Sequence, residues 1–475
     1  MTSPSDPVSG SRSQSQPQSE PQSDAASASA RPAAIAFGDA LRFWLKLGFI
    51  SFGGPAGQIA IMHAELVERR RWISERRFLH ALNYCMLLPG PEAQQLATYI
   101  GWLMHRTVGG LVAGGLFVLP SLLLLIALSW LYAAYGTLPV VAGLFYGIKP
   151  AVTAIVLHAA HRIGGRVLKN GWLWAVAIAA FVALFAFNTP FPLIVLAAAV
   201  AGVIGARVAP AAFSGNAGAH AAHAGHGPAI IGDDTPTPAH AHARFTKRRL
   251  LQVVGVGIGL WLAAMGGLAA RYGVDGALTV MGLFFTKAAL MTFGGAYAVL
   301  PYVVQGAVEQ HHWLTGPQMI DGLALGETTP GPLIMVVAFV GFMGGWNAQL
   351  FGPDAGLLAG AVAAAAVTFF TFLPSFVFVL AGGPLIESTH GNLRLTGPLT
   401  AITAAVVGVI VNLALFFAGH VFWPDGLNGR FDLASALIAA GAALALFRFR
   451  WSVPLLLGVC AVLGLAWSMA MTTRP

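Results

Sequence analysis

Long apolar runs recur along the whole chain, and they constrain its fold more than any other feature of the sequence. They lie at 111–130, 172–187, 357–380, 402–417 and 454–470. A helix needs about 20 apolar residues to cross the hydrocarbon core of a bilayer, so each run is a candidate span. One such run fits a buried helix of a soluble domain, but this many indicate an all-α integral membrane protein.

The balance of residue types agrees with a membrane protein. Hydrophobic residues make up 57% of the chain and charged residues only 9%, whereas a soluble domain carries about 25% charged residues. The formal net charge is +8, but Lys and Arg lie mostly in short clusters beside apolar runs, as the positive-inside rule requires. The charge therefore does not indicate a nucleic-acid partner. Cys85 and Cys460 lie far apart in or beside apolar stretches, which suggests neither a disulfide framework nor a metal site.

The chain contains an internal duplication. Phe-Gly-Gly at 52–54 and Pro-Gly-Pro at 89–91 recur at 293–295 and 330–332, an offset of 241 residues for both motifs (293 minus 52, and 330 minus 89). Further along, Leu-Pro-Ser at 119–121 recurs with a longer offset at 373–375. A constant offset over about 45 residues indicates a tandem duplication.

The duplication divides the chain into four parts. Residues 1–34, rich in Ser, Gln, Pro and Ala, are expected to form a disordered tail without signal-peptide features. The first repeat covers 35–209, a cytoplasmic linker covers 210–248, and a linking span plus the second repeat covers 249–475. The linker histidines are His220, His223, His226, His240 and His242. Their spacing fits no closed set of metal ligands, which favours a flexible linker over weak metal binding.

Each half opens with two apolar segments that break in the middle, the first at its Gly-Gly pair and the second at its Pro-Gly-Pro motif. Proline removes a hydrogen-bond donor and paired glycines weaken a helix. Such a break is tolerated at membrane depth only where protein or a water-filled cavity covers it. The segments fit kinked spans or re-entrant hairpins. Arginines flank the first Pro-Gly-Pro segment on both sides, which favours a hairpin with two cytoplasmic ends: Arg69, Arg70, Arg71, Arg76, Arg77 and Arg106.

Plain spans are expected to follow the hairpins. They lie near 109–134, 139–161, 172–188 and 190–208, then at the linking span 249–270, and then near 357–381, 397–420, 431–447 and 452–471. The extra span reverses the direction of the second half. The counterpart of the arginine-rich loop, 306–317, contains Glu309 and neither Lys nor Arg. This reversed charge asymmetry predicts two inverted repeats, an architecture common in secondary transporters, with the binding site near the bilayer midplane.

Two lysines stand at equivalent positions beside the Gly-Gly breaks, Lys46 and Lys287, each six residues before its Phe-Gly-Gly motif. Charges within membrane segments are costly and usually functional. Two cations related by the duplication suit a negatively charged substrate. The alternative is that each lysine extends to the interface or pairs with an acid such as Asp39.

The breaks themselves predict an anion site. A helix that restarts after such a break directs its free N–H groups and positive dipole end into the interior. Besides the lysines, the candidate anion-binding residues are Ser51, Gly53, Gly54, Gln58, Gly90, Pro91, Gln94, Thr292, Gly294, Gly295, Gly331 and Pro332. The alternative is that the glycines only allow close helix packing.

Two carboxylates accompany the breaks, Glu92 directly after the first Pro-Gly-Pro and Glu327 three residues before the second. Burial disfavours their charged form, so they are candidates for proton coupling. Pairing with a lysine or with backbone donors is the alternative. The sequence has no P-loop or recognisable nucleophile motif, so we expect neither an enzyme nor a cofactor.

The motifs at 52–58, 88–95, 293–297 and 329–332 together resemble the chromate transporter family in its long-chain, two-domain form. The resemblance covers about 35–209 and 249–470. It implies export of chromate from the bacterial cytoplasm across the inner membrane, and thereby chromate resistance. Sulfate is also a tetrahedral dianion, so a sulfate or other oxyanion carrier remains open, as do a passive anion channel and a non-transporting scaffold.

Outward movement of a dianion follows the membrane potential. At roughly 100 mV, negative inside, the gain is about 4.6 kcal/mol for two charges. Exchange with an ion or proton is compatible with this drive, and a homodimer is compatible with the sequence. Pro55, Glu92 and Gln95 have no like mates in the second half. We therefore expect the first half to dominate substrate contact.

Overall fold

The computed structural model describes residues 35–52, 54–213, 229–232, 245–293, 295–388, 396–426 and 428–472. Within these ranges the chain folds into helices, and the only β pairing is an isolated bridge between Ile73 and Ile231. The predicted all-α membrane fold is confirmed. The tail 1–34 and all five linker histidines lie outside the described residues.

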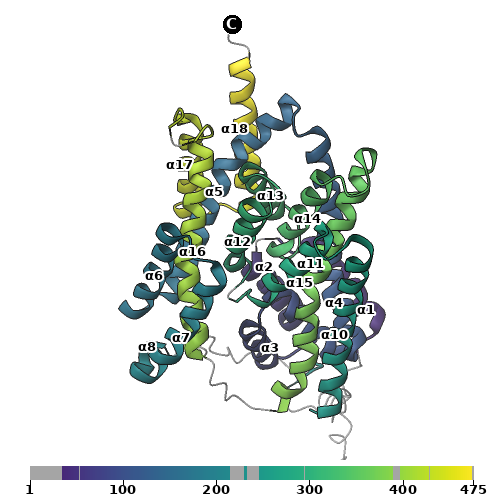
Figure 1. Cartoon of the computed structure of the whole chain (residues 1–475). Coiled ribbons are helices and arrows are strands. Elements are labelled where there is room, and N and C mark those ends of the chain that lie inside the picture. The colour runs from purple at the N-terminus through teal and green to yellow at the C-terminus, as the bar shows by residue number, and fades with distance from the viewer. Residues whose placement is uncertain are drawn as a thin grey trace, which may run out of the picture. The chain divides into compact units, whose positions relative to one another are not determined.

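The helices are described half by half, in the chain order that the colours of Figure 1 show. The first half contains α1 (Phe37–Ile50), α2 (Gly54–His63), α3 (Glu75–Leu87), α4 (Glu92–Tyr135), α5 (Pro139–Val167), α6 (Gly171–Phe187) and α7 (Phe191–Val208). The short α8 (Pro210–Phe213) and the linking helix α10 (Lys247–Tyr272) come next. The second half contains α11 (Ala277–Leu290), α12 (Ala296–Val304), α13 (Gly316–Thr328), a 3₁₀ turn (Leu333–Met335), α14 (Val336–Asn347), α15 (Gly356–Ser388), α16 (Thr396–Phe422), α17 (Leu433–Phe447) and α18 (Val453–Thr472).

Among the described residues, seven helices are long and apolar enough to cross a membrane: α4, α5, α7, α10, α15, α16 and α18. The helices α6, α11 and α17 and the segment Leu333–Asn347 are apolar but shorter. Each plain span expected from the sequence coincides with one of these helices. The hydrophobic runs alone therefore define the multi-pass architecture.

The first Pro-Gly-Pro segment folds as a hairpin. Helix α4 is interrupted at His105 and Arg106, whose backbone is not helical. A Cβ at Gly101 would lie 2.5 Å from the Cβ of Ala113, so the part of α4 before the interruption packs back against the part after it. At 1.5 Å per residue, α3 and the segment 92–104 are each about 20 Å long, too short for a core of about 30 Å. This geometry favours a re-entrant hairpin over a kinked span.

The second half repeats this arrangement. A Cβ at Gly345 would lie 2.7 Å from the Cβ of Ala363, so α14 packs back against α15. The similarity extends to backbone detail in the loops before α3 and α13. The N–H of Trp72 donates to the carbonyl oxygen of Leu66, and that of Trp313 to Ala307, both at 2.8 Å. The duplication is therefore one of three-dimensional structure as well as of sequence motifs.

The long helices of the two halves interlock. Helix α5 packs on α17 and α18 of the second half, and its mate α16 packs on α6 and α7 of the first half (Figure 1). The backbone approach is close, since a Cβ at Gly147 of α5 would collide with the carbonyl oxygen of Cys460 of α18. Reciprocal contacts of this kind are what a two-fold relation between the halves would produce. That the repeats are inverted across the membrane stays a prediction.

Candidate anion site at the crossed loops

The helix breaks of the two halves meet. We call residues 51–54, 88–91, 292–295 and 329–332 the crossed loops. The N–H of Gly90 donates to the carbonyl oxygen of Thr292 at 2.7 Å. Each Pro-Gly-Pro loop is thus joined to the Gly-Gly break of the other half, because the N–H of Gly331 donates to Ser51 in the same way, at 2.8 Å.

Ser51 and Thr292 shape the breaks through their hydroxyl groups. The Ser51 hydroxyl donates to the Leu47 carbonyl at 2.6 Å, and the Thr292 hydroxyl donates to the Ala288 carbonyl at 2.7 Å. Both side chains are fully buried. Their hydroxyl protons are used within α1 and α11, so what these residues offer the crossed loops is a backbone carbonyl. Gly53 and Gly294 lie outside the described residues.

The Pro-Gly-Pro glycines lie against two serines that the sequence had not singled out as site residues. Gly90 and Gly331 have φ of 129° and 110°, a backbone conformation that favours glycine. A Cβ at Gly90 would collide with the Ser375 hydroxyl of α15, and one at Gly331 would lie 2.7 Å from the Cβ of Ser121 of α4. These serines end the repeated Leu-Pro-Ser motif, and each touches the loop of the other half.

Unused hydrogen-bonding groups gather at this point. The hydroxyls of Ser121 and Ser375 are buried and have no hydrogen-bond partner among the described residues. A buried hydroxyl without a partner is costly, which indicates a bound water or ligand. Within the described part of the chain, the buried Gln94 amide bonds only to the Thr98 hydroxyl, at 3.0 Å. That hydroxyl can donate or accept, so either end of the amide can face a ligand.

Two further glutamines fasten the crossed loops. The Gln58 amide donates to the carbonyl oxygens of Ser51 and Gly331, and so joins the two halves. The Gln95 amide donates to the Pro89 carbonyl at 2.8 Å. At an offset of 241 residues, Val299 and Val336 stand in place of these glutamines in the second half. The glutamine hydrogen bonds therefore come from the first half, whereas both halves contribute loops.

The helices that start at the crossed loops have uncapped N-termini. In each hairpin the first arm is capped by a side chain, Ser74 for α3 and Thr315 for α13. The second arms, after Pro91 and Pro332, have no side-chain cap, and neither has α12 after Gly295. Free N–H groups and the helix dipole favour a negative charge at such ends.

Both candidate carboxylates lie at the second-half break. Glu92 Oε1 lies 4.0 Å from the Cβ position of Gly295. Glu327 accepts a hydrogen bond from the hydroxyl of Tyr297, a partner that the sequence did not suggest. Arg162 and Arg166 lie near the end of the same helix, α5, but in the described part of the chain neither forms an ion pair with Glu92 or Glu327. The carboxylates are thus adjacent to the crossed loops.

The structure does not bring the two lysines to the crossed loops. Lys46 and Lys287 are exposed on the outer faces of α1 and α11, and neither forms an ion pair with another described residue. Asp39 is exposed as well. Of the predicted site residues, those at the breaks converge and the lysines lie apart.

A second charged cluster escaped the sequence analysis. Asp321 of α13 is buried; its Oδ2 accepts a hydrogen bond from Tyr132 at 2.8 Å and lies 3.4 Å from Lys149 Nζ. Lys149 is an isolated charge within the span expected at 139–161. The signal that could have found Asp321 is an acidic residue in the apolar segment just before the second Pro-Gly-Pro motif.

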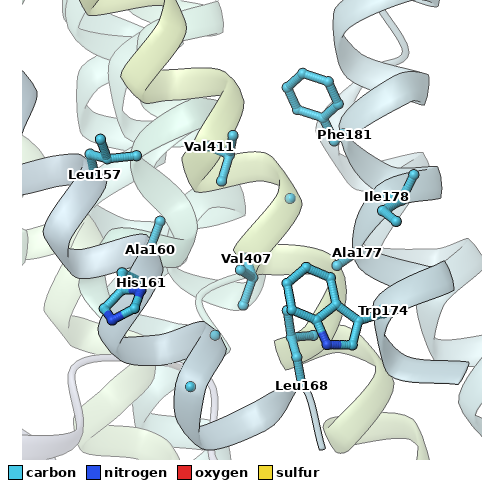
Figure 2. Close-up of a pocket in the computed structure, with 13 residues that line it drawn as sticks. Leu157, Ala160, His161, Leu168, Trp174, Ala177, Ile178, Phe181, Val407 and Val411 are labelled. Atoms are coloured by element: carbon cyan, nitrogen blue, oxygen red, sulfur yellow. The ribbon is translucent and has the colours of Figure 1, made fainter. Parts of the chain in front are cut away.

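A cavity of about 590 Å³ lies between α5, α6 and α16, away from the crossed loops (Figure 2). Figure 2 shows side chains such as Leu157, Trp174, Phe181 and Val411 around it, with His161 as the polar exception. An oxyanion needs several hydrogen-bond donors or cations. The apolar lining therefore argues against this cavity as the anion site.

Comparisons with known proteins identify the family of the chain. A family model described as chromate transporter matches residues 38–203 and 279–465. The chain is 31% identical to a chromate transport protein of Pseudomonas aeruginosa, over 87% of this chain and 93% of that protein. It is 29% identical to a chromate transport protein of Cupriavidus metallidurans (89% and 91%) and 26% identical to a probable chromate transport protein of Synechococcus elongatus (90% and 95%). No solved structure matches.

Proposed function

The chain belongs to the chromate transporter family, and on that premise we propose that it exports chromate from the cytoplasm across the bacterial inner membrane and thereby gives chromate resistance. It is a transporter and not an enzyme. The observation that carries the proposal is the set of unused polar groups at the crossed loops, where Ser121 and Ser375 meet uncapped helix N-termini.

The symmetry of the crossed loops suits a tetrahedral dianion. Each half contributes one serine hydroxyl and one helix start after Pro-Gly-Pro. A tetrahedron has two-fold axes, so donors related by a two-fold relation can bind its oxygens in two equivalent pairs. Hydrogen bonds to a charged acceptor are about twice as strong as neutral ones. The buried donors would therefore compensate for much of the water that chromate loses.

The membrane potential supplies the drive for export. Moving two negative charges outward gains about 4.6 kcal/mol at roughly 100 mV, which supports a concentration ratio on the order of a thousandfold. By the charge rule Arg162 and Arg166 lie at the cytoplasmic side, where they would attract the dianion. Glu92 and Glu327 are candidates for proton coupling, which would add to this drive.

Sulfate is the main rival substrate, because it has the same charge and shape as chromate. The names of the Pseudomonas aeruginosa and Cupriavidus metallidurans relatives favour chromate. A passive channel would use the same donors but would not couple flux to a second ion.

Uptake of labelled chromate into everted membrane vesicles tests the proposal, because everted vesicles turn export into uptake. We expect potential-driven accumulation, weakened by excess sulfate, that Ser121→Ala or Ser375→Ala lowers at least tenfold. Ser129→Ala is the matched control, since Ser129 is another buried serine of α4 whose hydroxyl has no partner among the described residues. Accumulation of sulfate without chromate would transfer the assignment to another oxyanion, and no flux of either would refute it.

A further inference from the structure

The cluster of Asp321, Lys149 and Tyr132 joins α13, α5 and α4, and therefore both halves. Asp321 Oδ2 accepts from the Tyr132 hydroxyl and faces Lys149 Nζ at 3.4 Å. Its other oxygen, Oδ1, is buried with no hydrogen-bond partner among the described residues. The Asp321 side chain is 3% exposed and that of Lys149 is 30% exposed. The acid is thus sealed in the protein, while the Lys149 side chain stays partly exposed.

A purely structural ion pair would have both partners well hydrogen-bonded and in closer contact. Burying charges is costly unless both partners are well hydrogen-bonded. Here one carboxylate oxygen is unused, and the 3.4 Å separation from the amine is loose. Contact between lipid and an ammonium group is also costly. The exposed part of Lys149 is therefore expected to face a water-filled path, where it can bind a second partner.

The elements packed on α13 bring few competing charges to Asp321. Helices α4 and α5 contribute Tyr132 and Lys149, while α14 and the turn Leu333–Met335 contain no titratable residue. Three other titratable groups belong to α13, α16 and α18. Glu327 of α13 accepts a hydrogen bond from Tyr297, and His420 of α16 lies against Gly316. The third is Cys460 of α18. Lys149 is therefore the cation that balances Asp321.

The cluster lies at a distance from the crossed loops that suits a second station for the substrate. At 1.5 Å per residue, Tyr132 is about 16 Å beyond Ser121 along α4, and Asp321 is about 13 Å before Pro330 along α13. Along α5, Lys149 is about 20 Å from Arg162, the next cation of the same helix. Helix α5 thus carries cations at two separate levels, and by the charge rule Lys149 is the outer one.

We propose that Lys149 is a second anion-binding residue, the release station of the path, at which the Asp321 carboxylate and the oxyanion compete for the same ammonium group. The inference rests on the proposed function, because it takes a dianion that leaves the crossed loops outward. A site on a transport path must bind strongly enough to be entered and weakly enough to be left. An internal carboxylate beside the cation meets this requirement by displacing the anion.

Transport kinetics in everted vesicles test the competition. Asp321→Asn removes the competitor, so we expect the apparent KM for chromate to fall about tenfold and turnover to fall with it, whereas Lys149→Met removes the binding cation and raises KM about tenfold. The double variant should behave like Lys149→Met, because the competitor has no effect without the cation. Lys169→Met, a charge loss just beyond the same helix, and Asp354→Asn, in an exposed loop, are matched controls.

Two outcomes overturn the release station. If the double variant restores the amount of folded protein and wild-type kinetics after both single variants have lost them, the pair is only structural. Wild-type kinetics in both single variants would also refute the release station. If a single variant fails to reach the membrane, the KM of the neutral double variant decides. A KM raised about tenfold supports the release station, and a wild-type KM refutes it.

The proposed function can fail separately. If Ser121→Ala stops transport while the Lys149 and Asp321 variants behave as wild type, only the release station is wrong. If wild-type vesicles carry sulfate instead of chromate, the same kinetic comparison is made with sulfate. If neither ion moves, both proposals fall.

Discussion

Gly331 donates its backbone N–H to the carbonyl oxygen of Ser51, 2.8 Å away, although the two residues belong to different halves of the chain. The mate of this bond joins Gly90 to Thr292. Neither half supplies the hydrogen-bond acceptor for its own Pro-Gly-Pro loop, because that carbonyl group comes from the Gly-Gly break of the other half. A site placed at this crossing is sensitive to both halves at once.

Replacing Gly90 or Gly331 by alanine should abolish transport and destabilise the protein. The new Cβ would meet Ser375 or Ser121, and the positive φ adds strain of about 1–3 kcal/mol. Transport in vesicles and thermal unfolding in detergent measure the two effects. Gly115→Ala is the control, because a Cβ at that position of α4 meets no atom within 4 Å. Equal behaviour of Gly331→Ala and Gly115→Ala would contradict the crossed-loop geometry.

Gln58→Val gives the first half the residue found at Val299 of the second. We expect transport to fall at least tenfold, because a carbonyl group that Gln58 now binds would stay buried without its donor, at a cost of about 1–3 kcal/mol. Gln252→Val, at an exposed position of α10, is the control. Unchanged transport in Gln58→Val would mean that this glutamine does not hold the loops.

Tyr297→Phe removes the hydroxyl that donates to Glu327. A carboxylate that loses a charge-assisted hydrogen bond is worse compensated by about 1.5–3 kcal/mol, so we expect chromate uptake to fall at least tenfold. The control is Tyr302→Phe, which removes the hydroxyl of another buried tyrosine of the same helix. If the two variants transport equally well, the Tyr297–Glu327 bond has no part in the cycle.

The inverted topology has its own test. Single cysteines at Arg70 and Gln310, in a background without Cys85 and Cys460, should react with a membrane-impermeant reagent from opposite sides. Arg70 follows the π-helical turn Ala64–Arg69, and Gln310 ends its counterpart Gln305–Gln310. Labelling of both positions from one side would rule out inverted repeats.

The two exposed lysines allow the predicted dominance of the first half to be measured. Both lysines lie apart from the crossed loops, so they can act on the dianion only at long range. If the first half dominates, Lys46→Ala should reduce chromate uptake more than Lys287→Ala does. We expect a modest loss of about three- to tenfold, since an exposed cation is screened by its surroundings. Abolition of transport by Lys287→Ala alone, with Lys46→Ala intact, would reverse the assignment.

Local sequence signals account for most of the fold. Apolar length predicted the long spans such as α5 and α16, and Pro-Gly-Pro predicted the helix breaks, because both effects act within a few residues. The pairing of those breaks could not be predicted in the same way. A hydrogen bond from Gly331 to Ser51 depends on how the two halves pack, and no local pattern encodes it.

The sequence pointed to the loops and to side chains beside them such as Gln58, but not to Ser121 and Ser375, and it placed the lysines wrongly. Lys46 stands at the expected place in the sequence, but the helix face it occupies follows from the packing of α1, and that face is exposed. Ser121 and Ser375 were visible as repeated motifs, yet their contact with the opposite loop is a long-range property. The Lys149–Asp321 pair was missed for the same reason, because its partners come from different halves.

The interlocked helices have a consequence for how the protein is made. Helix α5 is complete at Val167, but α17 and α18, on which it packs, begin only at Leu433. At a synthesis rate of about 5–20 residues per second, α5 waits roughly 15 to 50 s for its partners. During that time the face of α5 that packs on α17 and α18 is without these partners. Correct assembly of this transporter therefore depends on events in the ribosome-bound chain as well as on the finished sequence.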